Sequence, residues 1–147
     1  QLALRIKPIA RQYNVPLLIN DRLDIALAVD ADGVHVGQED LPVAVVRRLI
    51  GPDKILGATA VTEAAAQTAE REGADYIGKP GKQVLPLNVL AQIKQAVQVP
   101  VVAIGGITAD NLMTLKITGV DGLAVVSAIM DSADPAAATQ EILSRWC

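Results

Sequence analysis

Residues 101–127 read VVAIGGITADNLMTLKITGVDGLAVVS, and this stretch decides the fold. It holds two short apolar runs that end in small residues, Ile104-Gly105-Gly106-Ile107 and, one repeat later, Val125-Val126-Ser127. The segment 108–118 between them has apolar residues at helical spacing. Two strands joined by a helix predict parallel pairing through a right-handed crossover, because a tight turn can join only antiparallel strands. The stretch therefore predicts an α/β fold.

The same alternation runs through the rest of the chain. Runs of β-branched residues predict strands at 15–19, 33–36, 54–59, 74–77, 99–104 and 121–126. Amphipathic segments between strands predict helices at 62–72, 86–97 and 108–118. The core must come from Ala, Val, Ile and Leu, since the chain has no Phe, one Trp and two Tyr. Such residues suit a parallel sheet that helices cover.

Strand count and glycine placement favour different architectures. An open doubly wound sheet needs five or six strands, whereas a closed (β/α)₈ barrel needs eight and usually about 250 residues. The chain has no G-x-G-x-x-G after its first predicted strand, and its glycine-rich motif comes late. Glycine-rich ends on the last two strands are typical of the phosphate cup of such barrels. We therefore predict one (β/α)₈ barrel domain over residues 1–147, incomplete at its N-terminus.

The composition limits the kind of ligand and the location. The net charge is −3, and the absence of a basic run argues against a nucleic-acid partner. The only cysteine is Cys147, which excludes an internal disulfide and a Cys/His metal cluster. Apolar runs stay well short of the roughly 20 residues that cross a bilayer. We expect a cytoplasmic protein with small-molecule ligands and no membrane span, and a homo-oligomer is compatible with the sequence.

Two predicted neighbouring strands each lead into a carboxylate. Asp21 follows Asn20 at the end of one strand, and Asp40 follows the end of the next. The carboxyl ends of parallel strands lie at one edge of the sheet, where barrel enzymes keep their chemistry. Mg²⁺ prefers oxygen ligands and keeps coordination positions for substrate phosphates. Each Asp could instead cap a following helix, but the two together predict a Mg²⁺ site.

The glycine motif predicts a phosphate site. Gly105-Gly106 alone could be a tight turn before a Thr cap. Together with Val126-Ser127 it predicts a phosphate site, because glycine lets a phosphate approach the backbone and the amides at a helix start are hydrogen-bond donors.

Two further residues, His35 and Lys82, have both a structural and a functional interpretation. His35, the only histidine, lies inside a predicted strand, which favours a hydrogen-bonded structural role over an acid or base. Lys82 lies in a Lys-Pro-Gly-Lys loop after a strand, so it is either solvated or able to reach bound phosphates.

Taken in order, these motifs resemble the thiamine-phosphate synthase family. The resemblance covers nearly the whole chain and rests on residues 19–22 (INDR), 33–40 (GVHVGQED), 73–78 (GADYIG), 102–107 (VAIGGI) and 125–129 (VVSAI). It implies a transferase that joins a hydroxymethylpyrimidine diphosphate to a thiazole phosphate and releases pyrophosphate.

The resemblance also assigns residues to roles. It implies that Asp21 and Asp40 hold Mg²⁺ on the pyrophosphate, and that Asn20 and Thr59 contact the pyrimidine substrate. The thiazole phosphate would be held by Gly106 and the amides of Val126 and Ser127. Gln1 would be the remnant of a substrate-binding Gln-x-Arg-x-Lys motif, and Lys82 would reach bound phosphates.

The chain departs from the family pattern in two places. The first strand-helix unit and the Arg and Lys of the Gln-x-Arg-x-Lys motif are not found, and the loop after Gly78 is shortened. Two alternatives therefore stay open. A related thiazole tautomerase is expected to use a histidine where this chain has Thr59-Ala60-Val61-Thr62, and a non-catalytic barrel would only bind a phosphate ligand.

Overall fold

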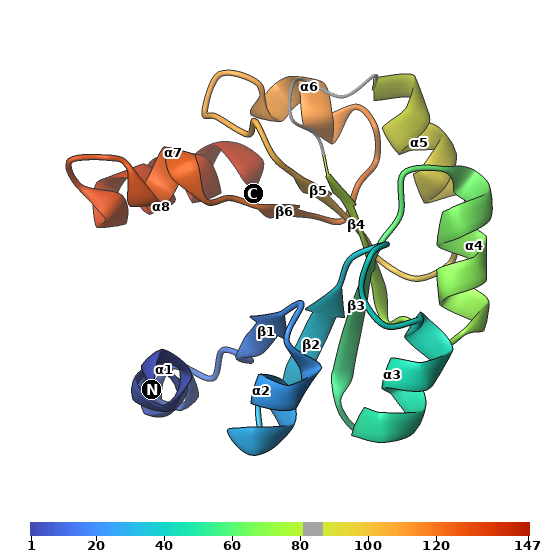
Figure 1. Ribbon diagram of the computed structural model, residues 1–147. Coiled ribbons are helices and arrows are strands. Elements are labelled where there is room, and N and C mark those ends of the chain that lie inside the picture. The colour runs from blue at the N-terminus through green and yellow to red at the C-terminus, as the bar shows by residue number, and fades with distance from the viewer. Residues whose placement is uncertain (81–86) are drawn as a thin grey trace.

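The computed structural model describes residues 1–80 and 87–147, and its centre is a parallel sheet. Within these described residues, six strands pair side by side in chain order, every pair parallel. The sheet curls, so that its concave face opens between the first strand and the last (Figure 1). The strands are β1 (Leu18–Asn20), β2 (Gly33–Val36), β3 (Ile55–Thr59), β4 (Tyr76–Pro80), β5 (Val101–Ile104) and β6 (Gly122–Ala124).

The helices take two positions relative to this sheet. Five cover its convex face, namely α2 (Leu23–Ala28), α3 (Val43–Ile50), α4 (Glu63–Arg71), α5 (Leu87–Ala96) and α6 (Leu112–Lys116) (Figure 1). The other three lie at the sheet edges, with α1 (Leu2–Gln12) beyond β1, and α7 (Ser127–Met130) and α8 (Pro135–Trp146) beyond β6. No helix in the described ranges combines the length and apolar character needed to cross a membrane.

The predicted parallel α/β fold is confirmed, and all six predicted strands are present, β2 with the predicted bounds and the other five with at least one shifted end. The described residues form six strands rather than the eight of a closed barrel, so β1 and β6 are the edges of a curled, half-barrel sheet. A strand-helix unit before residue 1 stays a prediction.

Alternation along the strands divides the side chains between two faces. Residues at every second position are 0 to 2% exposed and pack against the convex helices; they include Val34, Val36, Leu56, Ala58, Ile77 and Val101. Each aliphatic side chain removed from water in this way contributes about 1.5–3 kcal/mol. The residues between them face the concave side, because successive strand residues point to opposite faces. The concave wall is therefore free for a site.

Arg47, on α3, ties together the loops that lead into β3 and β4. Its guanidinium donates five hydrogen bonds: two to Gly73 O (3.0 and 2.8 Å), one each to Gly51 O (2.8 Å) and Lys54 O (2.7 Å), and one to the Asp75 carboxylate. A planar guanidinium has five N–H donors in a fixed fork, so this environment uses all of them. The amino-terminal edge of the sheet is thereby cross-linked opposite the site.

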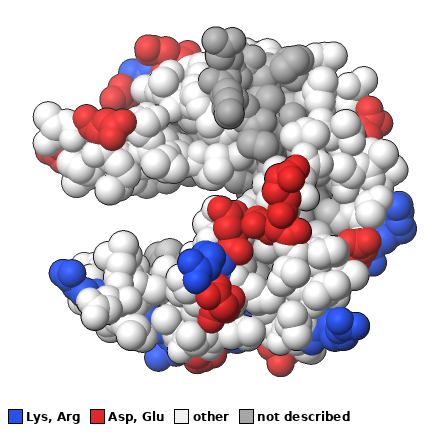
Figure 2. All heavy atoms as spheres, in the orientation of Figure 1, with Lys and Arg blue, Asp and Glu red and all other residues white. Residues whose placement is uncertain are grey.

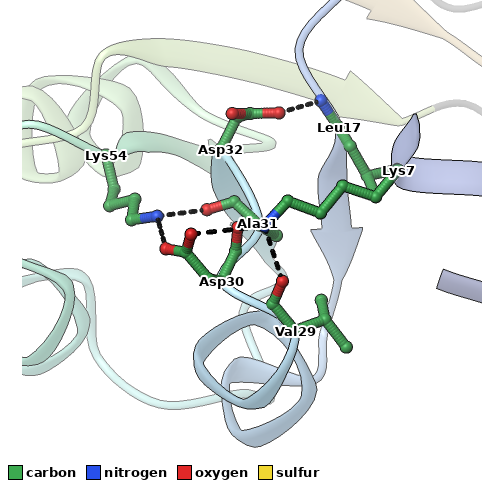
Figure 3. A network of polar contacts seen from close by, with 7 residues as sticks. All are labelled: Lys7, Leu17, Val29, Asp30, Ala31, Asp32 and Lys54. Atoms are coloured by element: carbon green, nitrogen blue, oxygen red, sulfur yellow. Dashed lines mark hydrogen bonds and ion pairs between the residues drawn. The ribbon is translucent and has the colours of Figure 1, made fainter. Parts of the chain in front are cut away.

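Helix α1 is attached by a polar contact rather than by a buried face. None of its residues is buried, and Leu2, Leu4 and Ile9 are exposed. Lys7 donates to Val29 O (2.8 Å) and contacts both the carbonyl and the carboxylate of Asp30, which Lys54 also approaches (Figure 3).

Both ammonium groups hold the pKa of Asp30 down at about 2, with Lys54 the larger cause and Lys7 the second. Asp30 is thus an ionised anchor for α1 at neutral pH.

Candidate active site at the carboxyl ends of the strands

A groove of about 190 Å³ runs along the concave wall, lined mainly by the inward residues of β1, β2, β4 and β5. Asn20 and His35 stand side by side in it, because they are register partners on β1 and β2. Tyr76 on β4 and Ile104 on β5 complete the line. In the space-filling view the concave side is a deep hollow, with acidic side chains gathered beside its inner end (Figure 2). The loops after β1 and β2 supply carboxylates to this edge.

Asp21 is held in an unusual backbone conformation directly after β1. Its φ is +63°, and Arg22 N–H donates to Asn20 O (2.8 Å) across it, closing a three-residue turn. A γ-turn with positive φ at its central residue is rare and strained. The predicted alternative, in which Asp21 caps a helix, is wrong, because α2 has Arg22 as its N-cap residue and no side-chain cap bond. The carboxylate is thus not used as a cap.

Asp40 is fixed by the loop that follows β2. Its Oδ2 accepts a hydrogen bond from Gly37 N (2.7 Å), and Asp40 N donates back to Gly37 O (3.3 Å). Helix α3 begins at Val43 with Pro42 as N-cap residue and no side-chain cap bond, so the cap role predicted as an alternative for Asp40 is also wrong. The loop instead positions the carboxylate.

The two carboxylates act electrostatically on the same histidine. Burial lowers the pKa of His35 below its usual value, while Asp21 and Asp40 each act to raise it. Both carboxylates therefore lie within electrostatic reach of one ring. Across residues 1–80 and 87–147, no group of three or more His, Cys, Asp or Glu side chains is placed to hold a metal ion. A cation here would have protein ligands from this pair and further ligands from water or substrate.

His35 on β2 lies between two hydroxyl groups, one on the neighbouring strand β3 and one on β4, the next strand beyond it. Its Nδ1 is 2.9 Å from Tyr76 Oη, and its Nε2 is 2.9 Å from Thr59 Oγ1. Burial also raises the pKa of the Tyr76 phenol, which therefore keeps its proton at neutral pH. The expected hydrogen-bonded role of His35 agrees with these contacts, and both of its ring nitrogens are engaged.

Glycines on β3 and β4 make room for this group. A Cβ added at Gly57 would lie 2.2 Å from the Tyr76 ring and 2.4 Å from His35 Nδ1, and one added at Gly78 would lie 2.8 Å from His35 Cε1. Such distances are far inside van der Waals contact, so only glycine fits at either position. The close approach of ring to backbone fixes where the imidazole lies.

The predicted phosphate loop follows β5. Gly105 and Gly106 both have left-handed φ values, +90° and +63°, which glycine adopts at no steric cost. Asn111 stabilises the loop by donating to Gly106 O (2.7 Å) and accepting from Thr108 N (3.0 Å). Among the described residues, and apart from Gly106 itself and its two chain neighbours, no heavy atom lies within 4 Å of the position that a Cβ of Gly106 would take. The loop thus presents open backbone at this edge.

Val126 and Ser127 follow β6, the strand next to β5, so both phosphate motifs leave the sheet at neighbouring carboxyl ends. Val126 is 65% exposed and immediately precedes α7. The phosphate role of these residues stays a prediction.

Two predicted substrate residues lie outside this arrangement. Gln1 is the N-cap residue of α1, beyond the β1 edge of the sheet, and its assignment to substrate binding stays a prediction (Figure 1). Lys82 lies outside the described residues.

Sequence reasoning missed Tyr76 and Asn111 as members of the site. Tyr76 was part of a recognised motif, but its contact with His35 depends on strand register rather than on sequence spacing. Asn111 could have been found from its place three residues after Thr108, a spacing that suits a side chain closing a local turn.

This fold and site define a class: barrel-type α/β enzymes, with carboxylates at one pair of strand ends and a glycine-rich loop at another. Residues 1–129 match the family described as thiamine monophosphate synthase. The chain is 50% identical over 154 residues to the thiamine-phosphate synthase of Methanobrevibacter smithii, covering 99% of this chain and 74% of that relative. The chain belongs to the thiamine monophosphate synthase family, which confirms the resemblance drawn from its motifs.

Solved structures agree with this membership. Thiamine phosphate pyrophosphorylase from Pyrococcus furiosus is 40% identical and superposes with a TM-score of 0.93, over 99% of this chain and 74% of that one. The 3-hexulose-6-phosphate synthase from Salmonella typhimurium is 19% identical, with a TM-score of 0.74 over 96% of this chain and 78% of that one. The second likeness concerns the fold alone.

Proposed function

We propose that this chain joins a hydroxymethylpyrimidine diphosphate to a thiazole phosphate and releases pyrophosphate, as a transferase of thiamine biosynthesis. Family membership supports this activity. The observation that carries the proposal is the set of polar residues at adjoining strand ends: Asn20 at the end of β1, Asp21 directly after it, and Asp40 in the loop after β2. The partners are small molecules and not nucleic acid. A cytoplasmic location and a homo-oligomer stay predictions.

Asp21 and Asp40 are the proposed Mg²⁺ ligands, and their chemistry fits that ion. Mg²⁺ is usually held by one or two carboxylates together with water and substrate phosphate oxygens. Asp40 uses one oxygen for Gly37 N, which orients the group and leaves the other oxygen for a ligand. When bound, Mg²⁺ would neutralise the diphosphate and make pyrophosphate a better leaving group.

The remaining residues are proposed to bind and orient the two substrates. Asn20 and Thr59 are assigned to the pyrimidine diphosphate, and Asn20 lines the concave groove. Gly106, with the amides of Val126 and Ser127, is assigned to the thiazole phosphate at the ends of β5 and β6. Each substrate would thus occupy its own pair of strands, with the reacting atoms between them.

The chemistry places few demands on acid or base groups. The bond from the pyrimidine methylene carbon to the diphosphate oxygen breaks, and its electron pair leaves with pyrophosphate. The thiazole nitrogen supplies the electron pair for the new bond to that carbon. This exchange needs no proton shuttle, which suits a site whose only histidine has both ring nitrogens hydrogen-bonded. The protein mainly positions the reactants.

The experiment measures thiamine phosphate formation with Mg²⁺ and with a chelator. Asp21→Asn and Asp40→Asn should each lower turnover about 100-fold, the effect of removing one electrostatic stabiliser from an active site. Asp24→Asn is the matched control, because Asp24 is an exposed carboxylate near the same loop that pairs with Arg22. Equal losses in all three variants, or full activity in chelator, would contradict the metal assignment.

The same assay separates the alternatives. Metal-independent aromatisation of a thiazole tautomer would instead support the tautomerase. Binding of phosphate ligands without product would support a non-catalytic barrel. The position where a tautomerase would carry histidine holds Val61 and Thr62, and Thr62 caps α4 by accepting from Ala65 N (3.2 Å).

A further inference from the structure

The inner wall carries a hydrogen-bonded chain of three side chains from three adjacent strands. It runs from Tyr76 on β4 to His35 on β2 and on to Thr59 on β3, with both links at 2.9 Å. We propose that Tyr76 and His35 are positioning residues, which hold the Thr59 hydroxyl as a hydrogen-bond donor toward the pyrimidine diphosphate. This inference rests on the proposed function, because it assigns a task to residues beside that substrate.

The direction in which the hydrogen bonds are donated follows from the acidity of the three groups. A phenol, with an ordinary pKa near 10, is the most acidic of the three groups, and an unprotonated imidazole nitrogen is the best acceptor among them. Tyr76 O–H therefore donates to His35 Nδ1. A neutral imidazole has one N–H, so that proton is on Nε2 and donates to Thr59 Oγ1. Thr59 uses its oxygen as an acceptor, and its own proton is left to donate to substrate.

Packing keeps the chain in this arrangement. Gly57 and Gly78 let the His35 ring lie directly against the backbone of β3 and β4, where any Cβ would collide with it. The His35 and Tyr76 rings are 5.4 Å apart between centroids and tilted by 33°. A ring fixed on this wall cannot turn without losing both hydrogen bonds. The Thr59 hydroxyl is therefore held in one rotamer by the His35 N–H before substrate binds.

This arrangement has an effect that packing alone does not have. A hydroxyl free to rotate must be ordered when substrate binds, whereas one already accepting from His35 loses less freedom. Hydrogen bonds in a chain also polarise one another, which makes the terminal donor stronger. The expected readout is therefore on one substrate, the pyrimidine diphosphate, and not on the thiazole phosphate.

The first test reads the tautomer without any assay of activity. His35 is the only histidine in the chain, so ¹⁵N-labelled histidine gives a single imidazole signal set in the NMR spectrum. We expect the Nε2–H tautomer in the full-length protein, and a shift toward a mixture of tautomers in Tyr76→Phe. An Nδ1–H tautomer, or a spectrum that Tyr76→Phe leaves unchanged, would overturn the proposed series of hydrogen bonds from Tyr76 through His35 to Thr59.

The second test is a double-mutant cycle on the Michaelis constants. Thr59→Val should raise KM for the pyrimidine diphosphate about tenfold, the value of one net hydrogen bond. Tyr76→Phe should raise it less, and should add nothing in the Thr59→Val background, because residues acting through one another are non-additive. KM for the thiazole phosphate should not change. Additive effects, or equal rises for both substrates, would refute the proposal.

Conservative variants separate positioning from a loss of folding. Thr59→Ser keeps the hydroxyl and should recover most of the lost affinity. His35→Gln keeps one N–H that can reach Thr59, so it should raise KM less than His35→Phe does. Thermal unfolding of every variant identifies any that fail to fold. If the wild-type protein forms no thiamine phosphate, the proposed function fails. The tautomer experiment needs no activity, so it still decides whether Tyr76, His35 and Thr59 are hydrogen-bonded in the proposed direction.

Discussion

Arg47→Met should destabilise the fold strongly and leave the site unaltered. The change keeps an unbranched side chain of similar length but removes five hydrogen bonds at the amino-terminal edge of the sheet. Three backbone carbonyls, of Gly51, Lys54 and Gly73, lose their guanidinium donor. At about 1 kcal/mol for each carbonyl, the free energy of unfolding should fall by about 3 kcal/mol. For a domain of this size that corresponds to a lower Tm by about 6–12 °C.

Chemical denaturation and thermal melting of the purified variant measure this loss. Arg48→Met is the matched control, because Arg48 is the exposed neighbour on the same helix. Both Michaelis constants, measured well below the Tm, should stay at wild-type values, since Arg47 binds loops at the edge of the sheet opposite the site. A loss no larger than that of Arg48→Met would refute the reasoning about the network. A changed KM would refute the separation of the two edges.

Two further predictions concern the phosphate loop and α1. Gly106→Leu should raise KM for the thiazole phosphate by at least about tenfold, the effect of losing a charge-assisted hydrogen bond, while Gly119→Leu should not. Both glycines have positive φ and, among the described residues, open space where a Cβ would lie, so the control carries a similar strain. The pKa of Asp30 is lowered to about 2 by Lys54 and Lys7, so its stabilisation of α1 is complete above the ordinary pKa of about 3.9 and is lost as the pH falls toward 2. The protection factors of the α1 amides, in which the pH dependence of intrinsic exchange is divided out, should therefore fall over that range, and Asp30→Asn should show low protection at every pH; protection in the wild-type chain that does not change with pH would contradict this.

The strands were predictable from β-branched runs, but, apart from β2, their exact ends were not. The first strand was expected from residue 15 and begins at Leu18. Pro16 has no N–H to give to a neighbour, and Leu17 N donates to the Asp32 carboxylate (2.8 Å) instead of to a strand. The helix expected at 108–118 is shorter, Leu112–Lys116, because Asn111 holds the preceding residues in a turn. In both cases a side chain competed with the regular backbone pattern.

The parts of the candidate site that depend on where strands end could be predicted from the sequence. The parts that depend on contacts between side chains from different strands could not. The placement of Asp21 and Asp40 at one edge of the sheet was predicted correctly, because parallel strands bring their carboxyl ends together; their role as metal ligands stays a prediction. The contacts of His35 depend on strand register and on the room left by Gly57, and the strained turn at Asp21 is a local backbone conformation closed by Arg22 N and Asn20 O. No local spacing in the sequence encodes either one.

The sheet tapers from its centre to its sides. The two middle strands, β3 and β4, have five residues each, β2 and β5 have four, and β1 and β6 have three. An exposed strand edge is a template on which other chains can add strands and aggregate, and very short edge strands weaken that template. A strand from another chain could pair with only three residues of backbone at either β1 or β6. Within the described residues, the taper therefore leaves little backbone at either side of the sheet for edge-to-edge aggregation.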